Sequence, residues 1–268
     1  MSTATPRKRL AVGELLRDWR RQRRLSQLAL ALRAEISTRH LSFVESGRAQ
    51  PSRGMILHLA EYLDVPLRER NDLLIAAGFA PRFKERPLCD PALEAARSAV
   101  DQILKGLEPY PALAVDRHWH LLASNQATLR LLAGVSAALL QPPVNVLRLS
   151  LHPEGLAPRI RNLPEWRAHL LDRLRRQIDA SSDPHLIALQ QELRSLSAPD
   201  SPAHVGDHPE ASIAVPIQLE VDGTVLCLFS TTTVFGTPVD ITLAELALEA
   251  FVPADAATAE RLRELALR

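Results

Sequence analysis

The stretch SQLALALRAEISTRHLSFVESGRAQPS, residues 26–52, decides the fold of the first part of this chain. Ser26 and Ser37 each precede a helical run, where a serine hydroxyl can accept a hydrogen bond from a free backbone N–H. Gly47 follows the second run, where helices often end in a left-handed conformation that glycine tolerates. The pattern predicts two short helices joined by a tight turn, the second with a polar N-terminal face. A helix of this kind fits the major groove of DNA.

Helical spacing continues on both sides of this stretch. It predicts five short helices between residues 10 and 80, with approximate bounds 12–23, 26–34, 38–46, 53–63 and 66–77. The core between the second and third helices is expected to contain Leu30, Ile36, Leu41 and Val44. Leu28 and Leu32 form a further apolar pair, for which burial in this core is favoured over contact with the rest of the chain.

The composition limits the class of protein. The chain has 268 residues, 46% hydrophobic and 24% charged, which is ordinary for a globular protein and long enough for two domains. It contains no apolar run that could span a membrane, and its basic N-terminus lacks the apolar segment of a signal peptide. Cys89 and Cys227 are too few for a disulfide framework or a zinc finger. We therefore expect a cytoplasmic protein without membrane contact.

Charge is unevenly distributed along the chain. Residues 1–88 contain 17 basic and 9 acidic residues, whereas the remainder contains 15 basic and 22 acidic residues. A basic segment joined to an acidic one is typical of a nucleic-acid-binding domain with an attached second domain.

The second part reads as an α+β domain. Prolines at 81, 87 and 91 predict a linker, followed by helices near 92–107 and 125–133 and a helical region at 163–197. A hairpin is expected at 112–124, and strands at 211–221, 224–235 and 239–250, with a turn at Asp222-Gly223. A short helix is expected at 255–268.

These elements predict a multidomain α and α+β protein. The first domain is a five-helix bundle with a helix-turn-helix, and the second is an antiparallel sheet with covering helices. The expected divisions are a disordered N-terminus at 1–9, a helix-turn-helix DNA-binding domain at 10–80, a linker at 81–90 and the α+β domain at 91–268.

The second domain shows no catalytic motif, and we expect no enzyme activity. His118 and His120 would share one strand face and could chelate a metal, but no carboxylate or cysteine joins them at a recognisable spacing, so no metal is predicted. The arginine-rich segment 167–176 is expected to form a solvated helix face. An apolar pocket and an ordinary core are equally compatible with the apolar residues Leu113, Val115, Leu121, Leu129, Leu132, Leu139, Leu140, Ile213, Val215, Ile217, Leu226, Leu228, Ile241 and Leu243.

The first domain resembles the XRE/Cro/C1-type regulators. The matching elements are Leu25-Ser26-Gln27, Leu30-Ala31, Ile36-Ser37, Leu41, Val44-Glu45, Gly47 and Pro51-Ser52. The resemblance implies that Gln27 binds a DNA phosphate, next to the favourable dipole of a helix N-terminus. Glu35 departs from the family pattern, which usually has a glycine at this turn.

The same resemblance implies which residues of the third helix read DNA. They are Thr38, Arg39, Ser42 and Phe43, with His40 on the DNA backbone. Arg39 is the expected base reader, because a guanidinium can bind guanine O6 and N7 together. Arg20 and Glu45 resemble a buried salt bridge of the family, with a DNA contact by Arg20 as the alternative.

Beyond the first domain, the chain resembles the MmyB-like regulators. The matching residues are Arg39-His40-Leu41-Ser42, Pro66-Leu67-Arg68-Glu69-Arg70-Asn71, Ala76-Ala77-Gly78-Phe79-Ala80-Pro81, Tyr110-Pro111-Ala112, Asn125 and Leu151-His152-Pro153-Glu154-Gly155. The resemblance implies a PAS-like domain that binds a small hydrophobic ligand such as a fatty acid. The expected ligand contacts are Asn125, Asn145, Arg148, His152 and Trp166.

Two of these ligand residues have structural alternatives. Asn125 could cap its helix and His152 could shape a loop, whereas Arg148 could pair with a ligand carboxylate. The resulting prediction is a ligand-controlled transcriptional repressor that binds a double-stranded DNA operator as a homodimer. It has no cofactor other than a bound fatty acid or similar apolar molecule. The alternatives are a second domain that docks a protein partner, and an enzyme with an attached DNA-binding domain.

Overall fold

The computed structural model describes residues 11–196 and 215–267. It divides into two units, one formed by Met1–Pro87 with Thr237–Ala244 and the other by Leu88–Gly236 with Glu245–Arg268. The sequence assigned all of 91–268 to the second domain, so the grouping of Thr237–Ala244 with the first unit differs from the prediction. Among the described residues, no helix has the length and apolar character needed to cross a membrane.

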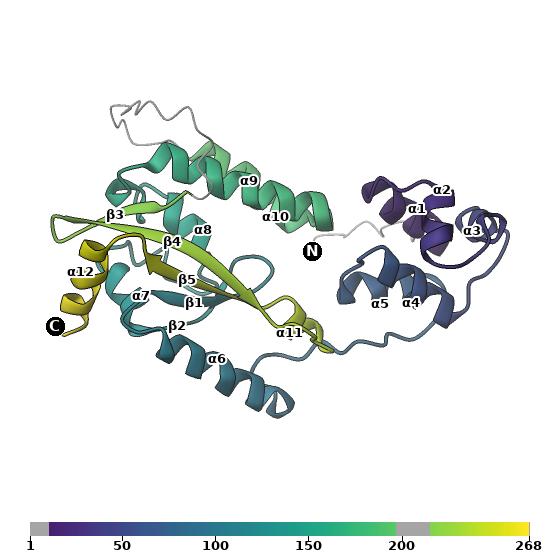
Figure 1. Cartoon of the computed structure of the whole chain (residues 1–268), viewed down its shortest axis with the longest axis horizontal. Helices are drawn as coiled ribbons and strands as arrows, with labels where there is room; N and C mark the ends of the chain where they lie inside the picture. The colour runs from purple at the N-terminus through teal and green to yellow at the C-terminus, as the bar shows by residue number, and fades with distance from the viewer. Residues whose placement is uncertain (1–10, 197–214, 268) are drawn as a thin grey trace, which may run out of the picture. The chain divides into compact units, whose positions relative to one another are not determined.

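The five predicted helices of the N-terminal region are present (Figure 1). They are α1 (Val12–Gln22), α2 (Gln27–Arg33), α3 (Thr38–Glu45), α4 (Arg53–Tyr62) and α5 (Leu67–Ala76). Ser26, Ser37 and Ser52 cap α2, α3 and α4, each accepting a backbone N–H at 3.0–3.2 Å. These bounds agree with the sequence prediction to within a residue or two, because the caps that set them are local in sequence.

Close contact between helices forms the core of the first unit. Leu30, Leu41 and Val44 are buried, and Ile36 is partly buried against them. A Cβ atom added at Gly13 would lie 2.3 Å from the Val44 carbonyl oxygen, so α1 can approach α3 only with glycine there. The expected burial of Leu28 and Leu32 is wrong: both side chains project from α2 and are 58% and 71% exposed.

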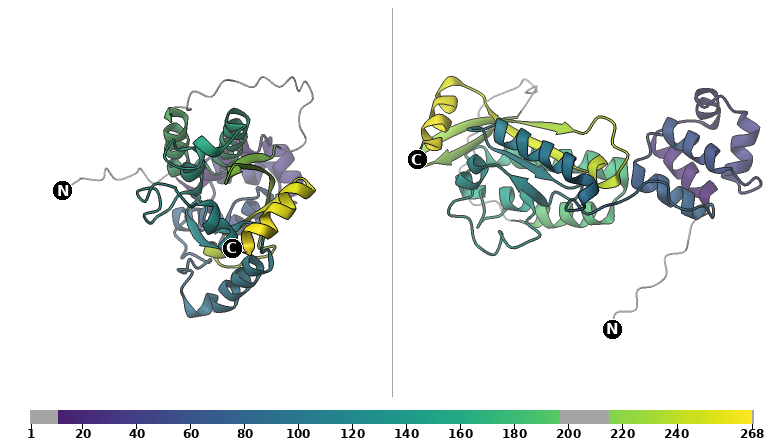
Figure 2. Two further views of the ribbon diagram at one scale, coloured as in Figure 1. Left: turned by 90° about the vertical axis from the view of Figure 1, so that its left-hand side faces the viewer. Right: turned by 90° about the horizontal axis from the view of Figure 1, so that it is seen from below.

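The second unit is built on a five-stranded antiparallel sheet with strand order β2-β1-β5-β4-β3 (Figures 1 and 2). The strands are β1 (Ala112–Val115), β2 (Leu121–Ser124), β3 (Ile217–Val221), β4 (Thr224–Val234) and β5 (Ala247–Pro253). The helices of this unit are α6 (Glu94–Gly106), α7 (Gln126–Leu131), α8 (Val146–Leu151), α9 (Leu163–Ser181), α10 (Pro184–Ser195) and α12 (Ala256–Ala266). The short 3-10 turns are η1 (Pro91–Leu93) and η2 (Ala157–Arg159).

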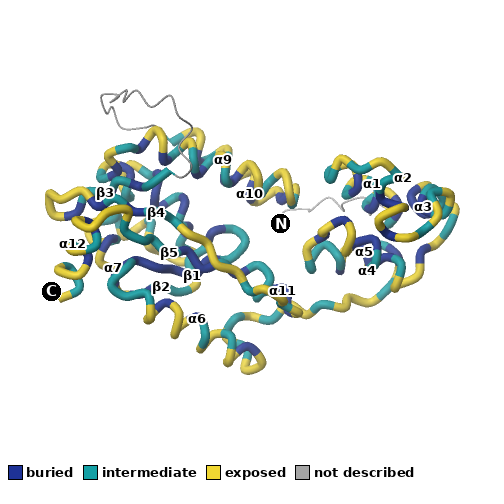
Figure 3. Tube along the Cα trace, viewed as in Figure 1, coloured by how far each residue is buried: buried dark blue, intermediate teal, exposed yellow. Residues whose placement is uncertain are grey.

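Strand β1 is buried along its whole length because both faces of the sheet are covered (Figure 3). Successive side chains of a strand point to opposite faces. Leu113 and Val115 accordingly join the larger core beneath α8, α9 and α10. Ala112 and Ala114 face the other way and share a small core with residues of α6. The large residues of the strand thus lie on the face that also carries the pocket.

Three predictions in the second domain require correction. The expected strand at 239–250 is instead the helix α11 (Ile241–Ala244) followed by β5. The helical region 163–197 is two helices, separated at Ser182, which has a left-handed φ of 54°, and Pro184. The sequence analysis also predicted no helix at the residues that form α8. The first part of the strand expected at 211–221 and the last residue of the helical region lie outside the described residues.

The segment between β4 and β5 is bound to the linker of the first unit. Asp240 is 2% exposed, and its Oδ2 accepts a hydrogen bond from Arg86 Nη1 at 2.7 Å. The Ile241 N–H donates to the carbonyl of Lys84 at 2.8 Å, and the Thr242 hydroxyl donates to the carbonyl of Arg86 at 2.5 Å. Residues 84–86 therefore pair with a segment that lies far away in sequence.

Candidate functional site

Helix α3 presents the residues that the sequence assigned to DNA. The Arg39 side chain is exposed, and Thr38, His40, Ser42 and Phe43 are half-buried. The Arg39 guanidinium lies 5.4 Å from the centre of the Phe43 ring, one helical turn away. This cation–π contact restrains Arg39 without using its N–H groups, which stay available to bind acceptors.

A buried ion pair joins α1 to the C-terminal end of α3. Arg20 Nε and Nη2 donate to the two carboxylate oxygens of Glu45 at 2.6 and 2.8 Å. Burial alone would raise the pKa of Glu45, but the hydrogen bonds from Arg20 and Gln27 outweigh it and lower that pKa below its ordinary value. The Glu45 hydrogen bond in turn raises the pKa of Arg20. Both groups are therefore charged at neutral pH, and their geometry is that of a structural brace.

Gln27 lies closer to this brace than the sequence indicated. Its Nε2 donates to Glu45 Oε2 at 2.8 Å, so one of its two N–H groups is already bonded. Glu35, which stands at the usual glycine position, adopts a left-handed φ of 52°. The turn thus keeps a glycine-like backbone, at a cost of about 1 kcal/mol for a residue with a Cβ atom.

The second unit contains a cavity, part of it open to solvent, between the sheet and its covering helices. Most lining residues are apolar: Pro111, Leu113, Trp119, Leu121, Leu131, Leu132, Val146, Leu147, Leu149, Leu156, Trp166, Leu170, Ile217, Leu219, Leu228 and Phe251. The polar lining residues are Thr128, Ser150, Arg173, Ser230 and Glu249.

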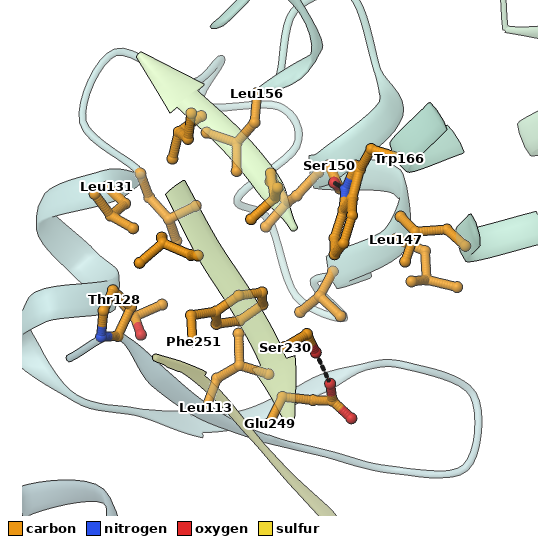
Figure 4. Close-up of a pocket in the computed structure, with 18 of the residues that line it drawn as sticks. Leu113, Thr128, Leu131, Leu147, Ser150, Leu156, Trp166, Ser230, Glu249 and Phe251 are labelled. Carbon is orange, nitrogen blue, oxygen red and sulfur yellow. Dashed lines mark hydrogen bonds between the residues drawn. The ribbon is translucent and has the colours of Figure 1, made fainter. Parts of the chain in front are cut away.

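Charged and hydroxyl groups meet at one part of this wall. Arg173 donates two hydrogen bonds to the Glu249 carboxylate, at 2.9 and 2.5 Å. Ser230 and Thr232 donate to the same carboxylate at 2.9 and 2.8 Å. The Arg173 guanidinium also lies 4.5 Å from the centre of the Trp119 ring. Figure 4 shows Ser230 and Glu249 joined by their hydrogen bond beside Leu113 and Phe251.

Of the five ligand contacts expected from the sequence, the structure places only Trp166 in the cavity wall. Its Nε1 donates to the Ser150 hydroxyl at 2.9 Å, so the indole presents an apolar surface (Figure 4). Asn125 and Asn145 are not lining residues. They cap α7 and α8, accepting the N–H groups of Thr128 and Arg148 at 3.1 and 3.0 Å.

Arg148 and His152 also lie outside the cavity wall. Arg148 is paired with Glu192, to which it donates at 2.5 and 2.7 Å. The Nδ1 atom of His152 accepts the N–H of Glu154 at 3.0 Å and so shapes the loop that follows α8. Neither side chain is placed to bind a molecule in the cavity.

The sequence missed Arg173, because segment 167–176 was expected to be a solvated helix face. Trp166, Leu170 and Arg173 are separated by four and three residues, which places them on one face of α9. This spacing could have identified Arg173 as a cavity residue, because an arginine that extends an apolar stripe is expected at the boundary of a core. Among the apolar residues proposed for a pocket, Leu113, Leu121, Leu132, Ile217 and Leu228 line it, and Ile213 lies outside the described residues.

Comparison with known protein families agrees with both the helix-turn-helix of the first unit and the cavity of the second. Residues 11–73 match a helix-turn-helix domain, and residues 96–265 match the MmyB-like transcription regulator ligand binding domain. A search of curated proteins finds no match. The second match covers more than half of the chain and includes the strands and helices that enclose the cavity. The protein therefore belongs to the MmyB-like family of transcription regulators, with an N-terminal helix-turn-helix domain and a C-terminal ligand-binding domain.

Proposed function

We propose that this regulator is a repressor whose affinity for its operator is controlled by a fatty acid, or a similar apolar acid, bound in the cavity of the second unit. The observation that carries the proposal is a largely apolar wall in which Arg173 is the only arginine among the described residues. Such a site suits a hydrocarbon chain with an anionic head group. The strand order 2-1-5-4-3 supports the PAS-like character of this domain.

Arg173 is the anchor for the acid head group. Its side chain is 24% exposed and can reorient toward an added acceptor, whereas Glu249 is 3% exposed and fixed by four hydrogen bonds. A ligand carboxylate would share the guanidinium with Glu249. Trp119 and Trp166 supply flat apolar surface for the chain of the ligand.

DNA is read by α3, with Arg39 as the residue that contacts base edges. Thr38, Ser42 and Phe43 complete the surface, and Gln27 and His40 contact the sugar-phosphate backbone. We propose a homodimer, because one short helix reads only a few base pairs. Two such helices bind half-sites about 34 Å apart, which corresponds to one turn of DNA.

The connection between β4 and β5 offers a route from ligand to DNA. Ser230 lies on β4, and Glu249 and Phe251 lie on β5, so both strands that flank α11 carry cavity residues. The same connection binds the linker through Asp240 and Arg86. Ligand binding changes operator affinity only if it favours one arrangement of these elements over another.

The proposal is tested by an operator-binding titration. An operator is first selected from random duplexes, and its affinity is then measured by fluorescence anisotropy at one fixed salt concentration, since phosphate contacts make affinity salt-dependent. Palmitic acid is added to saturation, with hexadecanol as a neutral control. A lower operator affinity with palmitic acid supports the proposal, whereas an unchanged affinity at saturation refutes ligand control.

Native mass spectrometry of the purified protein provides an independent check. A bound lipid of acidic type agrees with the proposed site. A stoichiometric protein partner, combined with no binding of palmitic acid, would instead identify the second domain as a docking module.

A further inference from the structure

The turn between β1 and β2 brings three metal-binding side chains together. Asp116, His118 and His120 each offer a ligand atom, and these atoms all lie within 4.8 Å of one another. The sequence indicated only the pair of histidines, with no carboxylate partner. Trp119 has a left-handed φ of 68°, which folds the chain back so that Asp116 reaches both histidines.

The carboxylate of Asp116 is oriented by the backbone of this turn. Its Oδ1 accepts the N–H groups of His118 and His120, both at 2.8 Å. Its Oδ2 lies 2.9 Å from His120 Nδ1. Two ligands that each lie about 2.1 Å from an ion and about 90° apart are separated by about 3 Å. The two atoms are therefore spaced as neighbouring ligands of one ion, as well as for a hydrogen bond.

His118 is held by a carboxylate on its far side. Its Nε2 lies 2.9 Å from Asp183 Oδ2, and the Asp183 side chain is 2% exposed. Arg117 Nε also lies 3.2 Å from this Nε2, so both neighbours engage the same ring nitrogen and Nδ1 is the one that remains for an ion. Metal-bound histidines are commonly oriented in this way by a carboxylate on the second ring nitrogen. Arg117 lies on the same far side, where it pairs with Asp183 and Glu245.

We propose that Asp116, His118 and His120 form a binding site for a divalent transition-metal ion of the zinc, cobalt, nickel or copper class. Two imidazoles and one carboxylate suit these ions better than magnesium or calcium, which favour all-oxygen sites. The three side chains are 32%, 26% and 33% exposed, so an ion can enter from solvent and keep water in its remaining positions.

A metal at this turn would also stiffen the ligand cavity. Trp119 stands between the two histidines, lines the cavity and lies against Arg173. An ion bound to the residues on both sides of Trp119 restricts the movement of the backbone at that position. Because coupling between two sites is reciprocal, the ion would change the affinity for an apolar ligand by the factor by which the ligand changes the affinity for the ion.

The site is tested with the full chain after removal of metals by a chelator. Isothermal titration with Zn²⁺ and Co²⁺ should show one ion per chain. His118→Ala and His120→Ala should each weaken binding at least tenfold. Asp116→Asn keeps the Oδ1 acceptor that orders the turn and should also weaken binding. His152→Gln is the matched control, because His152 lies in another loop of the same unit, and should leave the affinity unchanged.

A measurement on the unchanged protein guards against variants that fail to fold. Electron paramagnetic resonance of the Cu²⁺ complex should show coupling to two imidazole nitrogens. The proposal is overturned if the wild-type chain binds no ion at millimolar concentration. It is equally overturned if folded variants at Asp116, His118 and His120 keep wild-type affinity, or if the Cu²⁺ spectrum lacks imidazole coupling; the cluster is then a hydrogen-bonded turn only.

Discussion

Substitution of Glu249 by glutamine tests the two roles that we assign to Arg173. These are an ion pair that stabilises the fold and an anchor for the ligand carboxylate. The change keeps the size of the side chain but removes the charge that neutralises Arg173. It also replaces one acceptor oxygen by an N–H₂ group, which cannot accept from the guanidinium. Arg173 is then left with an unbalanced charge at the cavity wall, directly where a ligand carboxylate is proposed to bind.

The structure sets the expected size of each effect. Loss of one partner of a buried ion pair costs about 3–5 kcal/mol, but Arg173 is 24% exposed and stays against Trp119, so we expect about 2–3 kcal/mol of lost stability. For the ligand, a charge-assisted hydrogen bond contributes about 1.5–3 kcal/mol. At about 1.4 kcal/mol for each factor of ten, Glu249→Gln should bind palmitic acid about 10- to 100-fold more tightly.

The assay compares an acid with a neutral ligand of the same chain length. Displacement of a fluorescent probe gives the affinities of palmitic acid and hexadecanol, and urea unfolding gives the stability of each protein. Glu192→Gln is the matched control, because it removes the partner of Arg148 from a half-exposed pair outside the cavity. That pair should contribute at most about 1 kcal/mol. A Glu249→Gln protein that binds both ligands equally tightly, or binds the acid more weakly, refutes Arg173 as the anchor.

Three further predictions concern the DNA reader and its connection to the sensor. Arg39→Ala should cost about 1–3 kcal/mol at one base position and relax the preference there, whereas Gln27→Ala should weaken all duplexes alike; binding to a panel of single-base operator variants distinguishes the two. The folded-state pKa of Glu45 lies below its ordinary value of 4.5, so its contribution to stability is complete above about pH 4.5 and is lost as the pH falls toward that lower pKa. Urea unfolding between pH 7 and pH 3 should therefore show a shallower loss of stability for Glu45→Gln than for the wild type. Asp240→Ala removes the buried acceptor of Arg86 and should reduce the effect of palmitic acid on operator affinity while leaving palmitic acid binding itself within about twofold; an unchanged response would exclude this route.

The first unit was largely predictable because its determinants are local. Ser26, Ser37 and Ser52 define where three helices begin, and Gly47 follows the end of α3 with a φ of 74°. The Arg20–Glu45 ion pair was predicted from the family resemblance. In the structure, both carboxylate oxygens of Glu45 accept hydrogen bonds from Arg20. Local sequence patterns could not predict the exposure of Leu28 and Leu32, because it depends on where the neighbouring helices lie.

The second unit shows where sequence patterns lose information. The segment 239–250 alternates between apolar and polar residues as a strand does, yet Asp240 is anchored by Arg86, which lies more than 150 residues earlier. A contact of that separation leaves no local trace, so α11 was mistaken for a strand. The sequence predicted Arg148 as a partner for a ligand carboxylate, but in the structure Arg148 is paired with Glu192. Arg173, which we propose as the anchor, lies within a segment whose charge suggested only solvent exposure.

The register of β4 with β5 provides the connection between the cavity and the linker that the proposed mechanism requires. Ser230 pairs with Phe251, Thr232 with Glu249 and Val234 with Ala247. The cavity residues Ser230 and Glu249 therefore belong to the same strand ladder as Val234, where β4 ends and the connection to α11 begins. In the proposed mechanism, a shift of that ladder on ligand binding would also move the segment that holds Arg86. A tenfold change in operator affinity requires only about 1.4 kcal/mol of difference between two arrangements. One hydrogen bond between Arg173 and a ligand carboxylate, made in one arrangement and absent in the other, is sufficient for that.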